Sequence, residues 1–306
     1  MSGAVLPFPL PRARIGLLAG WGRYPIVLSE ALVRRGFEVY CLGVKDHADP
    51  ALKTICHDFE WVGLAKLGRA IRYFTRHEIF DATMAGKIHK VKLLQHGAWL
   101  KHLPDWRTIK MFFPHFISAR QDRKDDTLLT AIVEGFAEDQ ITFAPATDYA
   151  PELLVRYGQL TRRGPSRLQA KDIEFGWTLA KEMGRLDVGQ SVAIKGRAAV
   201  AVEAIEGTDQ CIRRAGELCR SGGFTVVKVA KPQQDMRFDV PTIGVSTLET
   251  MVAAGAKVLA VEAGRTIIVD EPQVLDFANR NGLILVALHA DGVCAEDEAA
   301  CATAES

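Results

Sequence analysis

The sequence predicts an α/β protein made of two domains. Its 306 residues fit two domains at roughly 150 residues each. The chain is 48% hydrophobic and 25% charged, which is the composition of a globular protein with a substantial core. Apolar strands alternate with helical segments along most of its length. We expect domains over residues 13–146 and 147–290, with flexible tails at 1–12 and 291–306.

The first half opens with a strand, a glycine turn, a helix and a second strand. Such an order is a βαβ unit, and its apolar strands predict a buried parallel sheet. The expected elements are a strand over 13–19, a helix over 25–35 that Gly36 ends, a strand over 37–44, a helix over 64–77, a strand over 79–85 and a helix over 128–137.

The second half combines a hairpin with further alternating elements. Residues 191–204 alternate around Lys195-Gly196, which predicts two paired strands. The other expected elements are helices over 173–183, 208–220, 246–254 and 273–279, and strands over 224–230, 257–263, 266–270 and 283–289.

Charge and composition exclude several functional classes. Lys and Arg number 38 against 37 for Asp and Glu, so no field of one sign favours nucleic acid. No apolar run reaches about 18 residues, and the N-terminal residues do not resemble a signal peptide. The six cysteines show neither a zinc-site spacing nor a disulfide framework, which favours a reducing cytoplasm.

A glycine turn follows the first strand. Gly20, Gly22 and Arg23 stand where backbone N–H groups at a helix N-terminus bind phosphate. Pro25 occupies the sixth position of the G-x-G-x-x-G pattern, which argues against a standard NAD loop. The turn is therefore either a phosphate or nucleotide loop or a plain tight turn.

Two further sites in the first half have a functional and a structural interpretation. Lys87 follows a strand at the edge where ligands bind in open α/β sheets, or it belongs to a solvated basic loop. Asp125 and Asp126 precede an apolar helix, where an N-cap pair is a sufficient explanation. A role for this pair with a metal or a sugar hydroxyl is the weaker alternative.

The second half carries the densest group of charged residues. Glu206 and Asp209 occur where a strand ends and a helix begins. The segment KPQQDMRFDVPTIG follows a later strand and contributes Lys231, Gln234, Asp235, Arg237 and Asp239. If the two segments face each other, they form an oxygen-lined site for Mg²⁺ or Mn²⁺ beside phosphate-binding cations. The alternative is a salt-bridged loop between two strands.

Six motifs in order resemble one known family. They are AGWGRYP, GKIHK, KDDTLL, LDVGQ, VEAIEGTD and KPQQDMRFDVPTIG. Together they resemble the LpxI-type UDP-2,3-diacylglucosamine pyrophosphatases, over about residues 13–288. The resemblance implies a Rossmann-like N-terminal domain plus a second α/β C-terminal domain, with the substrate cleft between them. It implies metal-dependent hydrolysis in lipid A biosynthesis, with water attacking the sugar-side phosphorus to give UMP and 2,3-diacylglucosamine 1-phosphate (lipid X).

The resemblance also assigns roles to individual residues. Asp235 takes the place of the essential aspartate, for metal binding or water activation. Asp239, Asp209 and Glu206 are candidate partners of Asp235 in holding Mg²⁺ or Mn²⁺. The candidate substrate contacts are Gly20, Gly22, Arg23, Lys87, Asp125, Asp126, Lys231, Gln234, Arg237, Thr242 and Gly244.

The expected partner is a small lipid-linked nucleotide sugar. We expect no nucleic acid, a cytoplasmic protein that touches the inner membrane transiently at its periphery, and a homodimer as an open option. A nucleotide-sugar binding protein without hydrolysis is the main alternative, and the charged loop at 231–239 is what it fails to explain. An NAD(P)-dependent oxidoreductase is the third option, and Pro25 argues against it.

Overall fold

The computed structural model describes residues 13–88, 105–110 and 125–290, and the side chains of 125–128 are outside the description. The expected tails at 1–12 and 291–306 therefore lie outside the described residues. The chain forms two compact units, Met1–Pro151 with Met236–Phe238, and Glu152–Asp235 with Asp239–Ser306.

The first unit contains a parallel sheet of five strands in the order β3-β2-β1-β4-β5. This order is the core of the doubly wound Rossmann arrangement, so the predicted Rossmann-like α/β class is confirmed. Its elements are β1 (Arg14–Ala19), α1 (Tyr24–Arg34), β2 (Glu38–Val44), α2 (Leu52–Ile55), β3 (Asp58–Val62), α3 (Leu67–Arg76), β4 (Asp81–Ala85), α7 (Asp125–Ala137), β5 (Thr142–Phe143) and α8 (Ala146–Tyr149).

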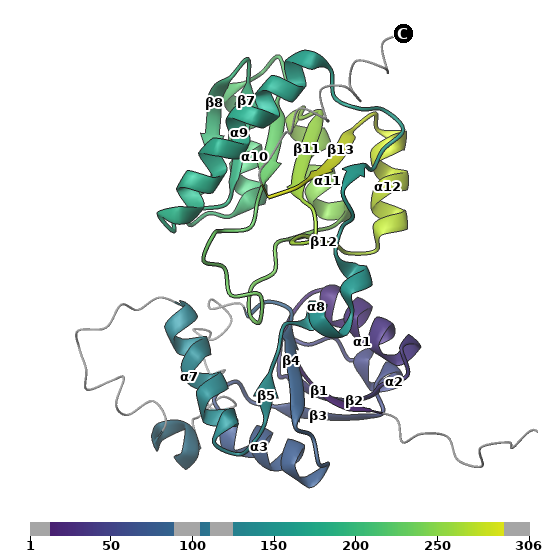
Figure 1. Ribbon diagram of the computed structural model, residues 1–306, viewed down its shortest axis with the longest axis vertical. Helices are drawn as coiled ribbons and strands as arrows, with labels where there is room; N and C mark the ends of the chain where they lie inside the picture. The colour runs from purple at the N-terminus through teal and green to yellow at the C-terminus, as the bar shows by residue number, and fades with distance from the viewer. Residues whose placement is uncertain (1–12, 89–104, 111–124, 291–306) are drawn as a thin grey trace, which may run out of the picture. The chain divides into compact units, whose positions relative to one another are not determined.

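Helices cover both faces of this sheet (Figure 1). Phe74 of α3 and Phe136 of α7 are fully buried against one face, beside Leu42 of β2 and Ala82 of β4. The helices α1 and α2 pack together and cover the other face. Because both faces are covered, the central strands β1 and β2 are apolar almost throughout, as is typical of parallel sheets, whereas the edge strand β3 carries Asp58 and Glu60.

The second unit contains a mixed sheet of six strands in the order β6-β13-β11-β9-β7-β8. The central strands β9, β11 and β13 are parallel, whereas β7 runs antiparallel to β9, and β8 antiparallel to β7. Its elements are η1 (Pro151–Leu153), β6 (Gly158–Gln159), α9 (Arg167–Arg185), β7 (Ser191–Lys195), β8 (Ala198–Val202), α10 (Thr208–Leu218), β9 (Thr225–Lys228), β10 (Thr242–Ile243), α11 (Val245–Ala254), β11 (Val258–Glu262), β12 (Ile267–Ile268), α12 (Glu271–Arg280) and β13 (Ile284–Leu288).

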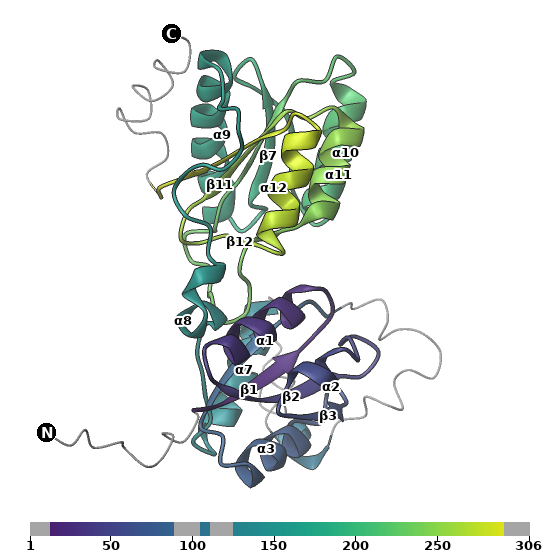
Figure 2. The ribbon, with the colours of Figure 1, turned by 90° about the vertical axis from the view of Figure 1, so that its right-hand side faces the viewer.

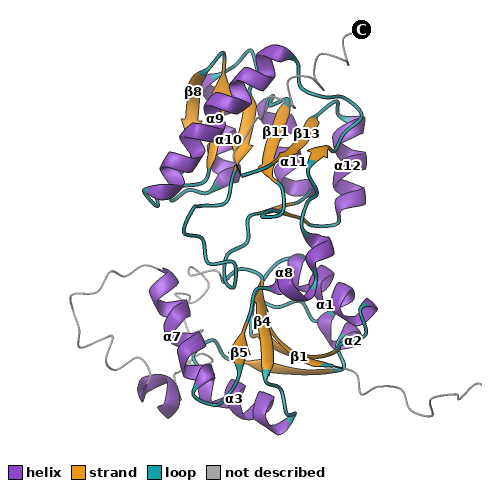
Figure 3. Ribbon diagram, viewed as in Figure 1, coloured by secondary structure: helices purple, strands orange, loops and turns teal. Residues whose placement is uncertain are grey.

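Helix α9 covers one face of this sheet, and α10, α11 and α12 cover the other (Figures 2 and 3). Alternate residues of each strand face opposite helices: Val226 packs with α10 and α11, whereas Val227 packs with α9. Helix α9 begins six residues before the expected start at 173, because Ser166 and Gln169 form a capping box. Trp177 and Met183 of α9 belong to the core.

The predicted hairpin is confirmed. Gly196 and Arg197 form its turn with φ angles of 60° and 58°, as in the type I′ turns that match the twist of paired strands. Both turn amides donate to the buried Asp172 carboxylate of α9, at 3.1 and 2.6 Å. At the other end of the hairpin, Glu203 donates its backbone N–H to the Ser191 carbonyl at 2.9 Å.

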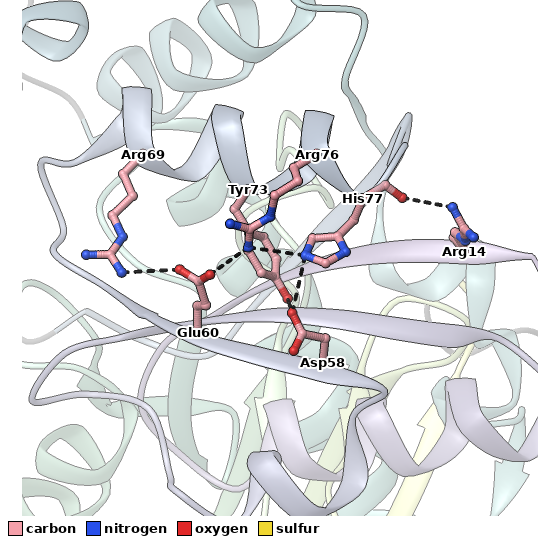
Figure 4. A network of polar contacts seen from close by, with 7 residues as sticks. All are labelled: Arg14, Asp58, Glu60, Arg69, Tyr73, Arg76 and His77. Atoms are coloured by element: carbon pink, nitrogen blue, oxygen red, sulfur yellow. Dashed lines mark hydrogen bonds and ion pairs between the residues drawn. The ribbon is translucent and has the colours of Figure 1, made fainter.

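A network of charged side chains lies on the edge strand β3 of the first unit (Figure 4). The Glu60 carboxylate accepts from Arg76 at 2.7 Å and from Arg69 at 3.2 Å. Asp58 accepts the Tyr73 hydroxyl at 2.9 Å and lies 3.4 Å from His77 Nε2. The hydrogen bond from Arg76 is the main reason that the pKa of Glu60 is lowered.

This lowered pKa predicts a pH-dependent contribution to stability. A carboxyl whose pKa is depressed by folding stabilises the fold above its unfolded pKa of about 4.3, and the contribution disappears as pH falls through the folded pKa. Glu60→Gln is therefore expected to reduce stability by up to about 1 kcal/mol at neutral pH and to have no effect near pH 2. Urea unfolding at several pH values measures this, with the exposed Glu134→Gln on α7 as control. An equal loss at both pH values would contradict the prediction.

Candidate functional site

The candidate site lies at one edge of the second sheet. Strands β8 and β9 run in the same direction, because each is antiparallel to β7 between them. Both therefore end at the same edge, where the 203–207 connection and the segment that contains the 231–239 loop leave the sheet. Ligands of open α/β sheets bind outside the carboxyl ends of the strands. The topology thus brings the two charged segments to one edge.

A buried polar cluster marks this edge. Lys228 ends β9, is 6% exposed and donates from Nζ to the Thr208 hydroxyl at 2.7 Å. Thr208 donates in turn to Glu203 Oε1 at 3.1 Å, and its hydroxyl also shares a hydrogen bond with Ser191 at 3.2 Å. The first turn of α10 is therefore bonded directly to the end of β9.

The loop that follows β9 is held in shape by its own polar groups. Lys231 donates its backbone N–H to Gln234 Oε1 at 2.9 Å, and Gln234 Nε2 donates to Asp239 Oδ2 at 2.6 Å. The Asp239 amide donates to the Asp235 carbonyl at 3.2 Å. The Lys231 ammonium forms an ion pair with Asp187 at 2.7 Å. Asp235 is half-buried within this closed turn.

Arg237 lies in the same loop and stacks its guanidinium over the Phe238 ring, 4.9 Å from the centroid. Beyond the loop, Thr242 begins β10 and donates its hydroxyl to the Val240 carbonyl at 2.8 Å. Gly244 caps α11, and a Cβ there would meet nothing within 4 Å. The backbone around Gly244 is therefore open to an approaching group.

Glu206 is bonded within its own segment. Its Oε1 accepts from Arg214 of α10 at 2.5 Å, and its Oε2 accepts the Ala204 amide at 3.1 Å. The pKa of Glu206 is lowered, first by the hydrogen bond from its own backbone amide and then by Arg214. It borders an open pocket of about 690 Å³ that Gln210, Arg213 and Glu217 also line. Asp209 follows in the first turn of α10.

The predicted metal ligands are not gathered into one group. Within the described ranges, which include all four of these carboxylates, no three or more His, Cys, Asp or Glu side chains are arranged to hold a metal ion. Glu206 is engaged with Arg214 and Asp239 with Gln234. The residues present do not fit a preformed site of four carboxylates.

The glycine turn of the first unit has a structural reason for its composition. Gly20 donates its N–H to the Ala85 carbonyl, and Trp21 exchanges two backbone hydrogen bonds with Lys87. A Cβ at Gly20 would stand 2.8 Å from the Lys87 carbonyl oxygen. Gly22 has a φ of 112° with open space around it, a conformation that favours glycine.

Local structure places the other charged residues predicted as substrate contacts in the first unit. Arg23 is the N-cap of α1 and lies 3.9 Å from Glu30. Helix α7 begins at Asp125 itself, so Asp125 and Asp126 form its first turn rather than precede it. Their side chains lie outside the described part of the chain.

Comparison with known proteins identifies the family. A model of the LpxI N-terminal domain matches residues 14–153, and one of the LpxI C-terminal domain matches residues 156–286. The chain belongs to the LpxI family. It is 28% identical over 284 residues to the UDP-2,3-diacylglucosamine pyrophosphatase LpxI of Caulobacter vibrioides, a match that covers 90% of this chain and 97% of the relative.

The sequence does not single out several charged residues at this sheet edge. Lys228 ends β9 and Glu262 ends the neighbouring β11, and Glu262 is bonded to Lys181 of α9 at 2.7 Å. A signal was nevertheless present in the sequence. Lys228 is the only charged residue of the strand TVVK, and Glu262 is the only charged residue of the strand VLAVE. Charged residues are almost never fully buried unless they are paired. A charged residue at the end of a buried strand therefore predicts a polar partner beside it, here Thr208 for Lys228 and Lys181 for Glu262.

Over the residues that the structure describes, no helix is both long and apolar enough to cross a membrane.

Proposed function

We propose that the protein hydrolyses UDP-2,3-diacylglucosamine to UMP and 2,3-diacylglucosamine 1-phosphate, a step of lipid A biosynthesis. The protein is a hydrolase of a phosphoric anhydride. The observation that carries the proposal is the closed loop of residues 231–239 at the carboxyl edge of a sheet, in whose sequence Asp235 stands between Lys231 and Arg237. The family membership and the name of the Caulobacter relative support the same activity.

The chemistry assigns roles to four residues of this loop. Asp235 orients and deprotonates the attacking water at the sugar-side phosphorus. Negative charge then concentrates on the bridging and terminal oxygens, and UMP leaves. Lys231 and Arg237 stabilise that charge, because a cation preorganised in a site of low dielectric acts more strongly than in water. Gln234 holds the turn and contacts the substrate through its amide.

The remaining proposed contacts bind the rest of the substrate. Thr242 and Gly244 offer a hydroxyl and an open backbone close to the loop in sequence. Gly22 and Arg23 stand at the N-terminus of α1, where backbone N–H groups and the helix dipole favour phosphate. The other proposed contacts are Gly20, Lys87, Asp125 and Asp126.

We propose that a divalent cation, Mg²⁺ or Mn²⁺, takes part. Mg²⁺ is commonly held by one or two carboxylates together with substrate phosphates rather than by a full protein cage. Asp235 is the first candidate for such a ligand, and Asp239, Asp209 and Glu206 are the others. When bound, the cation neutralises charge on the pyrophosphate.

Metal removal tests this proposal. Treatment with EDTA is expected to stop UMP release, and excess Mg²⁺ or Mn²⁺ is expected to restore it, because the pyrophosphate charge is otherwise uncompensated. Ca²⁺, which prefers longer bonds and more ligands, is expected to restore less. Full turnover in EDTA would reject the cation requirement.

A direct assay tests the activity itself. Purified protein is incubated with UDP-2,3-diacylglucosamine and Mg²⁺, and UMP and 2,3-diacylglucosamine 1-phosphate are measured by mass spectrometry. Release of both products supports hydrolysis. Tight binding without products would favour the alternative, a nucleotide-sugar binding protein.

The substrate also sets where the protein acts. A nucleotide sugar with two acyl chains resides at a membrane surface, so we propose a cytoplasmic protein that contacts the inner membrane transiently. A homodimer is part of the same proposal. Flotation with phospholipid vesicles and light scattering measure these two properties.

A further inference from the structure

A buried ion pair lies at the root of the loop that carries Asp235. Glu262 is fully buried, and its Oε2 accepts from Lys181 Nζ at 2.7 Å. The same oxygen accepts the backbone N–H of Ala230 at 2.8 Å, and Lys181 also donates to the Ala230 carbonyl at 3.3 Å. The pair thus holds both backbone polar groups of Ala230.

Ala230 is the last buried residue before the loop. Lys231 follows at once and is bonded to Gln234 and Asp187. The end of α9 packs closely here, since a Cβ at Gly184 would stand 3.2 Å from the Lys231 Cα. The loop therefore starts from a backbone position that α9 and β11 fix together.

Stability alone does not explain charges at this place. Burying a carboxylate is costly, and an apolar pair of similar volume is often as stable as a buried ion pair. Glu262 Oε1 makes no hydrogen bond, and its ion-pair partner Arg265 lies 3.8 Å away. An apolar pair, however, could not form hydrogen bonds with the backbone N–H and carbonyl of Ala230.

We propose that Glu262 and Lys181 are positioning residues for hydrolysis. They fix the Ala230 peptide, and through it the orientation in which the loop presents Asp235 to the phosphorus. This inference rests on the proposed function.

The test replaces the pair while keeping the core filled. In Lys181→Met/Glu262→Leu, Ala230 loses both side-chain partners. Amide hydrogen exchange of residues 230–239 is expected to become faster. The kcat is expected to fall about 10- to 100-fold with KM nearly unchanged, because small misplacements of a reacting group cost that much.

The matched control is the exposed ion pair of α12. Asp276 and Arg280 lie 2.7 Å apart, and their side chains are 64% and 68% exposed. Asp276→Leu/Arg280→Met is expected to change neither loop exchange nor kcat. Glu262→Gln keeps an oxygen for the Ala230 amide, so it is expected to retain slow exchange and an intermediate kcat.

Two results would overturn the inference: unchanged loop exchange in the Lys181/Glu262 double variant, or faster exchange with wild-type kcat. If the double variant does not fold, Glu262→Gln carries the kinetic measurement, because the partner it leaves behind, Lys181, is partly exposed, and wild-type kcat in this variant would then overturn the inference. Wild-type protein that releases no UMP would refute the proposed function separately, and the exchange measurement would still decide whether the pair anchors the loop.

Discussion

Replacing Asp235 with Asn is expected to lower the kcat for UMP release by about 10²- to 10⁴-fold, the usual contribution of a positioned general base. The amide has the same shape as the carboxylate but neither accepts a proton nor carries charge. The hydrogen bond between the Asp239 amide and Asp235 is kept, because it is accepted by the backbone carbonyl of Asp235 rather than by its side chain. Steady-state kinetics with a coupled UMP assay measure the effect.

Asp276→Asn provides the control for this substitution. Asp276 is an exposed carboxylate of α12 that pairs with Arg280. Its neutralisation is expected to leave kcat and KM unchanged. Both variants are expected to melt near the wild-type temperature. Wild-type turnover in Asp235→Asn would remove the catalytic assignment.

Gly189→Ala is expected to destabilise the second unit by more than about 3 kcal/mol, which exceeds ordinary overpacking. A Cβ at Gly189 would fall on the carbonyl oxygen of Glu203, far inside van der Waals contact. Because this oxygen belongs to the backbone at the end of β8, no rotation of a side chain can relieve the clash. Chemical denaturation followed by circular dichroism measures the loss.

Gly264→Ala separates this clash from the general cost of losing a glycine. Gly264 has a φ of 68° with nothing within 4 Å of a Cβ, so only its backbone conformation is penalised. Its expected loss is about 1 kcal/mol. Equal losses at the two positions would contradict the clash at Gly189.

The sequence predicts the long elements well and the short ones poorly. The first strand, α1 and the 191–204 hairpin are confirmed because hydrophobic period and turn glycines agree there. Strand β3, with the sequence DFEWV, was missed because its charged residues join the Glu60 network at a sheet edge. Two-residue strands such as β5 and β10 have no period to detect.

At the candidate site, too, some features can be predicted from the sequence and others cannot. The sequence singles out the 231–239 loop and the 203–209 connection, and the parallel directions of β8 and β9 explain why both reach one edge. It does not reveal that Glu206 is engaged by Arg214, because that bond depends on how the first turns of α10 are placed. Nor does it pair Lys181 with Glu262, which are 81 residues apart.

The tight turn at Gly196 and Arg197 also has a consequence for how this gene can change over generations. Side chains alternate between the two faces of a strand, so a slip of one residue reverses every side chain beyond it. A single-codon insertion or deletion that shifted this pairing by one residue would turn Glu203 away from Thr208, toward the opposite layer. Insertions and deletions in related sequences should therefore be rare in this turn, although it lies at the opposite end of the strands from the candidate site.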